Sequence, residues 1–345
     1  MQPLGMVGTM RLPGPRGPLS AALRDDLLAG SVSPATVDLA RAAAAGSADP
    51  LHDDDLQLAL ALCYELHYRG FDGVDDTLEW DPDLLTLRAH LERRHLAALC
   101  ELTGPVAVSG EPVDRQLTAL IAADDGPSLS SFMAKRGTAE QWREYLTLRS
   151  VYHLKEADPH TFAIPRLSGR AKAAMVEIQA DEYGGGAPGR MHSELFAGMM
   201  RDLGLDAGYG ALWDDAPAVA FTSVNTMSLF GLHRRWRAAA LGHLACVEMT
   251  SSEPSRRYSA GLRRLGHDAT TTVFYDEHVE ADAVHEQIAS VDMCGSLVAE
   301  DPSLAGDVLF GAACSLALDG LAARHLLGAW ESGRSALRGE DALVA

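Results

Sequence analysis

The sequence predicts an all-α protein, and three observations lead to this prediction. Segments rich in Ala, Leu, Glu and Arg follow one another along most of the chain. Within these segments apolar residues recur at positions i, i+3 and i+4, the spacing of one face of an α-helix. Strand-like alternation is sparse, and many of the segments end near glycine, which commonly terminates helices.

Composition narrows the class of protein further. The chain has 345 residues, 47% of them hydrophobic, which is enough to bury a sizeable core in one or two domains. Its net charge of −19 argues against binding to nucleic acid or to an anionic membrane surface, because phosphate contacts need clustered Lys and Arg. The five cysteines are scattered without a CxxC motif, so we expect reduced thiols in a cytoplasmic protein.

The first 125 residues are expected to form an N-terminal helical region. The start, MQPLGMVGTMRLPGPRGPLS, lacks the continuous apolar segment of a signal peptide, and we expect a loose N-terminal arm there. Helices should follow within residues 34–46, 55–70, 81–104 and 113–126. The segment DDGPSLSSF, with a proline and three serines, is the expected joint to the next region.

Residues 126–340 are expected to form a second domain, a helical bundle. The expected helical runs cover residues 139–167, 169–186, 191–205, 225–252, 253–266, 274–289 and 305–332. The last run contains the longest apolar stretch of the chain, which is interrupted by Asp319, Arg324 and His325. It therefore predicts a buried or amphipathic helix and not a membrane span.

Several polar residues occupy positions inside these apolar helices. Glu248 lies in GHLACVEMTSS, where a buried carboxylate would need a cation or a metal ion. Glu182 precedes three glycines at which the helix should break, and His192 opens the next helix. Taken alone, that stretch is better explained by an ordinary turn between helices. Glu156 alone would more often be an exposed helix carboxylate.

In FYDEHVEADAVHEQIA, His278, Asp282 and His285 follow one another at spacings of four and three, which places them on one face of a helix. Alone, a solvated polar face is the more frequent explanation. Together with Glu156, Glu182, His192 and Glu248, however, they make four carboxylates and three imidazoles on successive helices. Such oxygen and nitrogen ligands suit iron or manganese, and the carboxylates would offset the charge of two ions.

These residues resemble the heme-oxygenase-like diiron oxidases, or iron-containing redox enzymes. The resemblance covers about residues 140 to 331 and rests on three segments: HLKEADPHTFAIPRLSGRAKAAMVEIQADEYGGGAPGRMHSELF, LFGLHRRWRAAALGHLACVEMTSSEPSRRY and FYDEHVEADAVH. The paired Glu-x-x-His motif of ferritin-like diiron proteins is absent at these positions. The intervals between the seven residues, 26, 10, 56, 30, 4 and 3, are similar to those of the N-oxygenating members of the family.

The resemblance implies a fold, a cofactor and a reaction. The fold would be a heme-oxygenase-like helical bundle preceded by an N-terminal helical dimerisation region, which suggests a homodimer. Two Fe(II) ions per chain would be bound, with O2 as co-substrate and an external electron donor such as a reductase. The metal ligands carried over are Glu156, Glu182, His192, Glu248, His278, Asp282 and His285.

The implied reaction is N-oxygenation of an amine or guanidine-type nitrogen in a small amino-acid-derived substrate, in specialised metabolism. A relative that hydroxylates a methylated arginine carries an additional C-terminal cupin domain. This sequence ends at Ala345 without one, so nitrogen–nitrogen bond formation is not expected. Asn225, Arg257 and Tyr258 are candidates for the wall of the substrate pocket.

Several other functions are compatible with parts of this sequence pattern. Within the family, the alternative is oxidative C–C cleavage or decarboxylation. A heme-binding protein or a non-catalytic helical protein would have the same class of fold but no use for seven metal-binding side chains. Hydrolase and nucleotide-loop motifs are absent from the sequence. Glu65 and His67 are two residues apart, which favours packing over a shared site.

Overall fold

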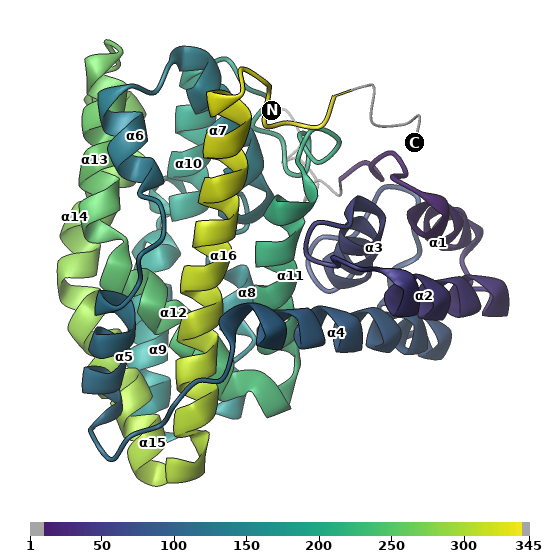
Figure 1. The fold of residues 1–345 in the computed structure, drawn as a ribbon, viewed down its shortest axis with the longest axis horizontal. Coiled ribbons are helices and arrows are strands. Elements are labelled where there is room, and N and C mark those ends of the chain that lie inside the picture. Colours follow the sequence, from purple (N-terminus) through teal and green to yellow (C-terminus); the bar gives the residue numbers. More distant parts are fainter. Residues whose placement is uncertain (1–9, 340–345) are drawn as a thin grey trace.

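The computed structural model describes residues 10–339, except for the side chains of residues 280–284. Throughout the described residues the regular structure is helical (Figure 1), with a single isolated bridge between Met10 and Phe71. The prediction of an all-α fold is confirmed.

The N-terminal helices lie together at one side of the molecule (Figure 1). They are α1 (Pro18–Ala29), α2 (Pro34–Gly46), α3 (Asp54–Glu65) and α4 (Pro82–Thr103), with a 3-10 turn, η1 (Asp76–Trp80), between the last two. The side chains of Ser33, Asp53 and Asp81 accept hydrogen bonds from the first backbone N–H groups of α2, α3 and α4. These caps explain why the three helices begin where they do.

The remaining helices form the bundle. They are α5 (Val113–Ala122), α6 (Leu129–Lys135), α7 (Ala139–His153), α8 (Asp158–Thr161), α9 (Gly169–Glu182), α10 (His192–Asp202), α11 (Ala218–Leu232), α12 (Arg237–Thr250), α13 (Ser252–Arg264), α14 (Ala269–Gln287), α15 (Ser296–Glu300) and α16 (Ala305–Glu331). Between them lie 3-10 turns η2 (Ile164–Arg166), η3 (Gly184–Gly186), η4 (Pro188–Arg190), η5 (Arg234–Trp236) and η7 (Pro302–Leu304), and a π-helix, η6 (Ile288–Gly295), continues α14.

Two expected helical runs are divided in the structure. The run over residues 139–167 is interrupted after His153, and the run over residues 225–252 is interrupted at His233, whose backbone is extended. The residues at the interruptions are mostly polar, LKEADPHT after His153 and HRR from His233, so the predicted runs extended too far across them. Helix α5, which precedes the expected joint, packs against α16 and the π-helix of the bundle.

The long helix α16 runs through the bundle and packs most extensively against α12 (Figure 1). By length and composition it could cross a membrane, but 56% of its most apolar window is buried against the other helices. A glycine on each helix permits a close approach. A Cβ at Gly242 would lie 1.8 Å from the carbonyl oxygen of Val308, and one at Gly311 would lie 2.0 Å from that of Ala239. This contact fixes the position of α12, which carries Glu248.

Buried polar contacts join the N-terminal helices to the bundle. The ammonium group of Lys155 donates to Glu65 Oε2 at 2.7 Å, and both side chains are almost fully buried. Tyr209 donates its hydroxyl proton to the other oxygen of Glu65 at 2.7 Å. Lys155 also lies 4.1 Å from the ring centroid of Tyr68. Because Lys155 precedes Glu156, the N-terminal helices hold the turn that carries a predicted ligand.

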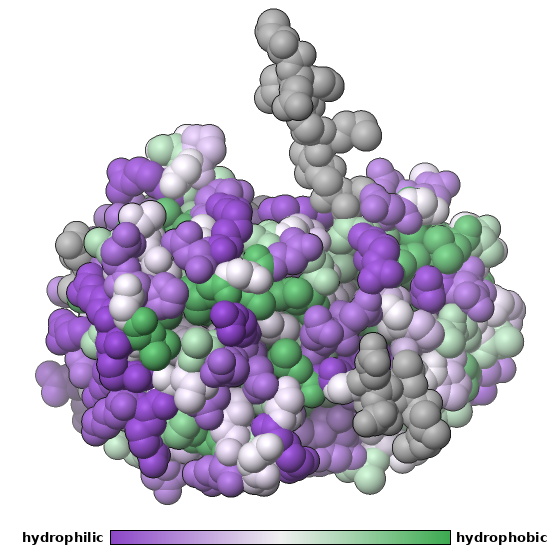
Figure 2. Space-filling view, turned by 90° about the horizontal axis from the view of Figure 1, so that it is seen from above, coloured by the Kyte–Doolittle hydropathy of each residue, from purple (hydrophilic) through white to green (hydrophobic). Residues whose placement is uncertain are grey.

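The face of the molecule in Figure 2 is mostly hydrophilic, with smaller hydrophobic areas between the polar side chains. Apolar residues are concentrated in one core that extends through both groups of helices. Polar side chains inside that core therefore need a structural or functional explanation.

Candidate metal centre

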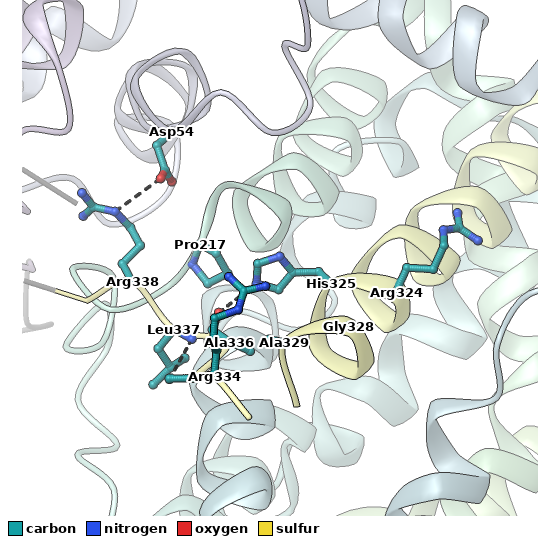
Figure 3. Close-up of a pocket in the computed structure, with 11 residues that line it drawn as sticks. Asp54, Pro217, Arg324, His325, Gly328, Ala329, Arg334, Ala336, Leu337 and Arg338 are labelled. Atoms are coloured by element: carbon teal, nitrogen blue, oxygen red, sulfur yellow. Dashed lines mark hydrogen bonds and ion pairs between the residues drawn. The ribbon is translucent and has the colours of Figure 1, made fainter. Parts of the chain in front are cut away.

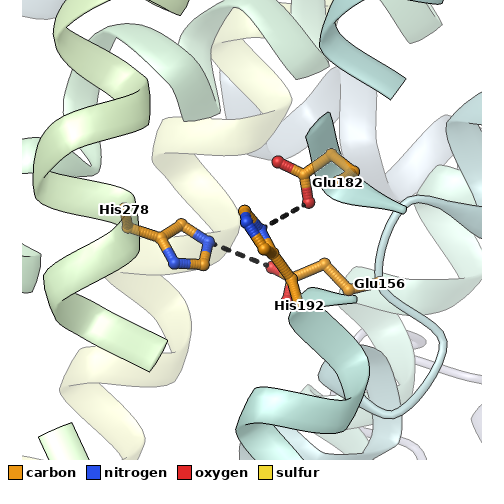
Figure 4. A group of neighbouring side chains, drawn as sticks. All are labelled: Glu156, Glu182, His192 and His278. Atoms are coloured by element: carbon orange, nitrogen blue, oxygen red, sulfur yellow. Dashed lines mark ion pairs between the residues drawn. The ribbon is translucent and has the colours of Figure 1, made fainter. Parts of the chain in front are cut away.

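Four predicted ligands meet in the core of the bundle. Glu156 follows α7, Glu182 ends α9, His192 begins α10 and His278 lies in α14. Each offers a ligand atom, and these atoms lie within 4.8 Å of one another. Figure 4 shows the four side chains directed toward a common point. We call them the first group.

A second group adjoins the first. It consists of Glu182, Glu248 from α12 and His285 from α14, whose ligand atoms also lie within 4.8 Å of one another. Glu182 therefore belongs to both groups. Two adjacent positions that share one carboxylate have the layout that a pair of metal ions requires, and six of the seven predicted ligands contribute to it.

The glycines after α9 explain how Glu182 and His192 meet. Gly184, Gly185 and Gly186 have φ values of 67°, 62° and 80°, in the left-handed region that favours glycine. A Cβ at Gly184 would lie 2.6 Å from the carbonyl carbon of Arg190, so the chain turns back tightly here. As a result, His192 Nδ1 lies 2.9 Å from Glu182 Oε2. The segment is both a turn between helices and a support for the candidate centre.

Glu156 is held by a strained turn. The next residue, Ala157, has φ 74° and ψ −31°, and is the one non-glycine residue with positive φ among those described. Glu156 Oε1 lies 3.7 Å from Nε2 of His153 and 3.7 Å from Nε2 of His278. Its Oε2 is buried and has no hydrogen-bond partner. An unpartnered buried carboxylate oxygen is costly, and a metal ion would satisfy it.

The electrostatics of the centre favour ionised carboxylates. Burial alone would raise the pKa of Glu156, but the imidazoles of His153 and His278 outweigh burial and lower it to about 2. Burial would lower the pKa of His285, but its contacts with Glu248 and Asp181 raise it to about 9. Carboxylates that stay ionised in the core are suited to bind cations.

The chemistry of the donor set fits iron. Carboxylate oxygens and imidazole nitrogens without sulfur suit iron or manganese, and neither group contains a cysteine. Each of the six residues is no more than 9% exposed. Phe196 and Phe274 lie beside the first group, where His153 stacks on Phe196 with 4.8 Å between ring centroids. The surroundings are therefore apolar and poor in water.

Sequence reasoning missed two side chains next to the ligands, His153 and Asp181. His153 donates from Nδ1 to the carbonyl oxygen of Arg149 at 3.1 Å, which turns Nε2 toward Glu156. Asp181 Oδ2 accepts a hydrogen bond from His285 Nε2 at 2.9 Å. The proximity of both to predicted ligands in the sequence was the available signal. The directions of these two side chains depend on where α7 and α9 end, and the sequence pattern does not define those positions.

The other predicted site residues lie elsewhere or outside the described residues. The side chain of Asp282 falls within the segment that is not described. Asn225 is fully buried and donates to the backbone and side-chain oxygens of Gln57, a contact between α11 and α3. Arg257 is partly exposed and pairs with Glu253.

Tyr258 stacks on Tyr145 with 5.1 Å between ring centroids, in a cluster that includes Trp142 and Tyr275. A surface hollow of 480 Å³ lies apart from the candidate centre (Figure 3). It is lined by residues such as Arg334, His325 and Arg338, the last of which pairs with Asp54 at 3.4 Å. None of the six clustered ligands lines this hollow.

Comparison with known proteins identifies the family of the stretch that contains the candidate centre. Residues 143–320 match the model of a family described as iron-containing redox enzymes, of the heme-oxygenase type. The matched stretch spans half of the chain and contains every predicted ligand. The chain belongs to this family.

A particular relative is the nitrosourea synthase of Streptomyces achromogenes subsp. streptozoticus. The two proteins are 23% identical over 176 residues, which represent 51% of this chain and 37% of the relative. This chain thus aligns with little more than a third of the length of that relative.

Proposed function

We propose that the protein is a non-heme diiron oxygenase that uses O2 to oxygenate an amine or guanidine-type nitrogen of a small amino-acid-derived substrate. The observation that carries this proposal is the shared ligand: Glu182 links the group of Glu156, His192 and His278 to the group of Glu248 and His285. A single metal ion would leave part of this buried set unsatisfied. Membership of an iron-containing redox family supports iron as the metal.

The side chains have distinct parts in this proposal. Glu156, Glu182, His192 and His278 would hold one iron, and Glu182, Glu248 and His285 the other. The iron pair would supply the redox chemistry that activates O2. The chain excludes water by burying the ligands, and its close-packed imidazoles keep the Glu156 carboxylate ionised. An external electron donor, such as a reductase, would return the centre to its reduced state.

The type of reaction comes from the relative. Its name, nitrosourea synthase, concerns a product that contains oxidised nitrogen. We therefore propose that this chain also oxygenates nitrogen. In a screen of substrates, oxidative C–C cleavage would be the alternative outcome. A homodimer formed through the N-terminal helices, a cytoplasmic location and a role in specialised metabolism belong to the same proposal.

Anaerobic loading with Fe(II), followed by stopped-flow absorbance on mixing with O2, tests the proposal. We expect about two irons per chain and a transient visible band, whose decay is accelerated by amine substrates. Binding of one iron or none, with no transient band, would contradict the diiron proposal. A Soret band after incubation with heme would instead favour the heme-binding alternative.

Two variants make this test specific. Glu182→Ala should lose both irons, because its carboxylate serves both groups. Glu177→Gln is the matched control: Glu177 is exposed on the same helix, and we expect it to bind iron as the wild type does. If Glu182→Ala still binds two irons, Glu182 is not the shared ligand.

A further inference from the structure

The imidazole of His285 lies between two carboxylates. Its Nδ1 is 3.2 Å from Glu248 Oε2, and its Nε2 is 2.9 Å from Asp181 Oδ2. The imidazole and Glu248 are almost completely buried, whereas the side chain of Asp181 is 61% exposed. One carboxylate therefore faces the interior of the candidate centre and the other faces its outer side.

The geometry distinguishes the two ring nitrogens. Nδ1 is on the side of Glu248, which belongs to the second group, while Nε2 is directed toward Asp181, which does not. A nitrogen that donates a proton to a carboxylate cannot at the same time give its lone pair to a metal ion. Both ring nitrogens lie at hydrogen-bond distance from a carboxylate, but Glu248 is itself a candidate ligand and Asp181 is not. When Glu248 binds a metal, Nδ1 is therefore the nitrogen that is available to the same ion, and Nε2–H is the group that Asp181 holds.

The C-terminal end of α9 carries two carboxylates of this arrangement. Asp181 and Glu182 are consecutive, so their side chains leave the helix in directions about 100° apart. Glu182 enters both groups of the centre, and Asp181 reaches the far side of the His285 ring. The same helix end thus supplies a ligand and a partner for another ligand.

We propose that Asp181 is a positioning residue for the second metal: it fixes the ring orientation of His285 and strengthens Nδ1 as a ligand. The proposal rests on the diiron function above. Carboxylates that accept the second N–H of a metal-binding histidine commonly have this effect, and their loss lowers metal affinity by about 10- to 100-fold. Solvent around Asp181 weakens the contact, so we expect the lower part of that range.

Anaerobic equilibrium titration with Fe(II) and with Co(II), followed by absorbance, tests the assignment. In Asp181→Ala we expect one of the two binding steps to weaken about tenfold while the other is unchanged. Asp181→Glu, which can still reach Nε2, should recover most of the affinity. Glu177→Gln removes one exposed charge a turn earlier on α9 and should leave both steps as in the wild type.

The outcomes separate this inference from the proposed function. If the wild type binds two metal ions and Asp181→Ala binds both with unchanged affinity, the role of Asp181 is refuted while the diiron proposal stands. Equal weakening of both steps would also refute it, since it would indicate a general electrostatic effect. If the wild type binds no more than one ion, the diiron proposal itself fails.

Discussion

His95 is an imidazole held neutral inside the molecule. It is fully buried between α3 and α11, where Nδ1 accepts from Gln57 Nε2 at 3.0 Å and Nε2 donates to Thr226 Oγ1 at 2.9 Å. Burial lowers the pKa of His95 from 6.5 to about 4. Between these pH values the unfolded chain binds a proton at His95 that the folded protein does not, so acid favours unfolding.

We expect this residue to make stability depend on pH. As the pH falls from about 6.5 to 4, the free energy of unfolding should decrease by roughly 3 kcal/mol on account of His95. His95→Gln can keep an acceptor and a donor but cannot titrate. Urea denaturation across this pH range should therefore show a shallower decrease for the variant, and parallel curves would contradict the expectation.

For individual residues, the sequence predicted which side chains come together better than it predicted how they are arranged. The spacing of His278 and His285 on one helix and the resemblance to the family were enough to select six side chains that converge. The sharing of Glu182 between two groups could not be predicted, because it depends on the angle at which α9 meets α12 and α14. The contact of Asp181 with His285 was missed for the same reason: spacing along the chain does not show which neighbour a side chain reaches.

The helices α12 and α16 are in contact through glycines, and this makes their spacing sensitive to one methyl group. In Gly311→Ala the new Cβ would lie 2.0 Å from the carbonyl oxygen of Ala239, so the helices would have to separate. We expect a loss of about 1–3 kcal/mol in the free energy of unfolding. Iron binding should also weaken, because α12 carries Glu248.

Gly328→Ala is the matched control on the same helix. A Cβ at Gly328 has no atom within 4 Å, and alanine is the better helix former by about 0.5–1 kcal/mol. Thermal unfolding of the two variants checks the prediction. If Gly311→Ala unfolds at the same temperature as Gly328→Ala, the close contact is not rigid.

Helix positions were largely predictable and helix interruptions were not. Caps such as Ser33, Asp53 and Asp81 mark helix starts in the sequence and in the structure alike. The break after His153 has no glycine or proline at that point, whereas Gly231 precedes the break at His233 by two residues. The π-helix at Ile288–Gly295 is likewise invisible to periodicity, since its wider turn differs little from an α-helix over eight residues.

For the whole molecule, the N-terminal helices and the bundle are coupled by a buried ion pair. The contact of Lys155 with Glu65 reaches from the family-matched residues 143–320 to a helix outside them. Removing one partner of a buried pair leaves an uncompensated charge, which costs about 3–5 kcal/mol. The two groups of helices should therefore unfold in one transition.

A double-mutant cycle measures this coupling. Lys155→Met and Glu65→Gln should each destabilise strongly, and the double variant should be more stable than the sum of the two effects predicts, by on the order of 2 kcal/mol. The exposed pair of Arg256 with Glu253 serves as a control and should show a coupling below about 0.5 kcal/mol. Additive effects at Lys155 and Glu65 would show that the N-terminal helices are energetically independent.

The unusual backbone of Ala157 has a consequence for engineering. Its φ of 74° costs an alanine on the order of 1–3 kcal/mol, and glycine would adopt it with less strain. Natural selection has thus tolerated a less durable fold beside Glu156. A laboratory selection for heat resistance alone would favour Ala157→Gly. The added backbone freedom, however, would make the position of the Glu156 carboxylate less well defined. At this residue, greater stability of the fold and better preorganisation of the candidate ligand Glu156 therefore require different amino acids.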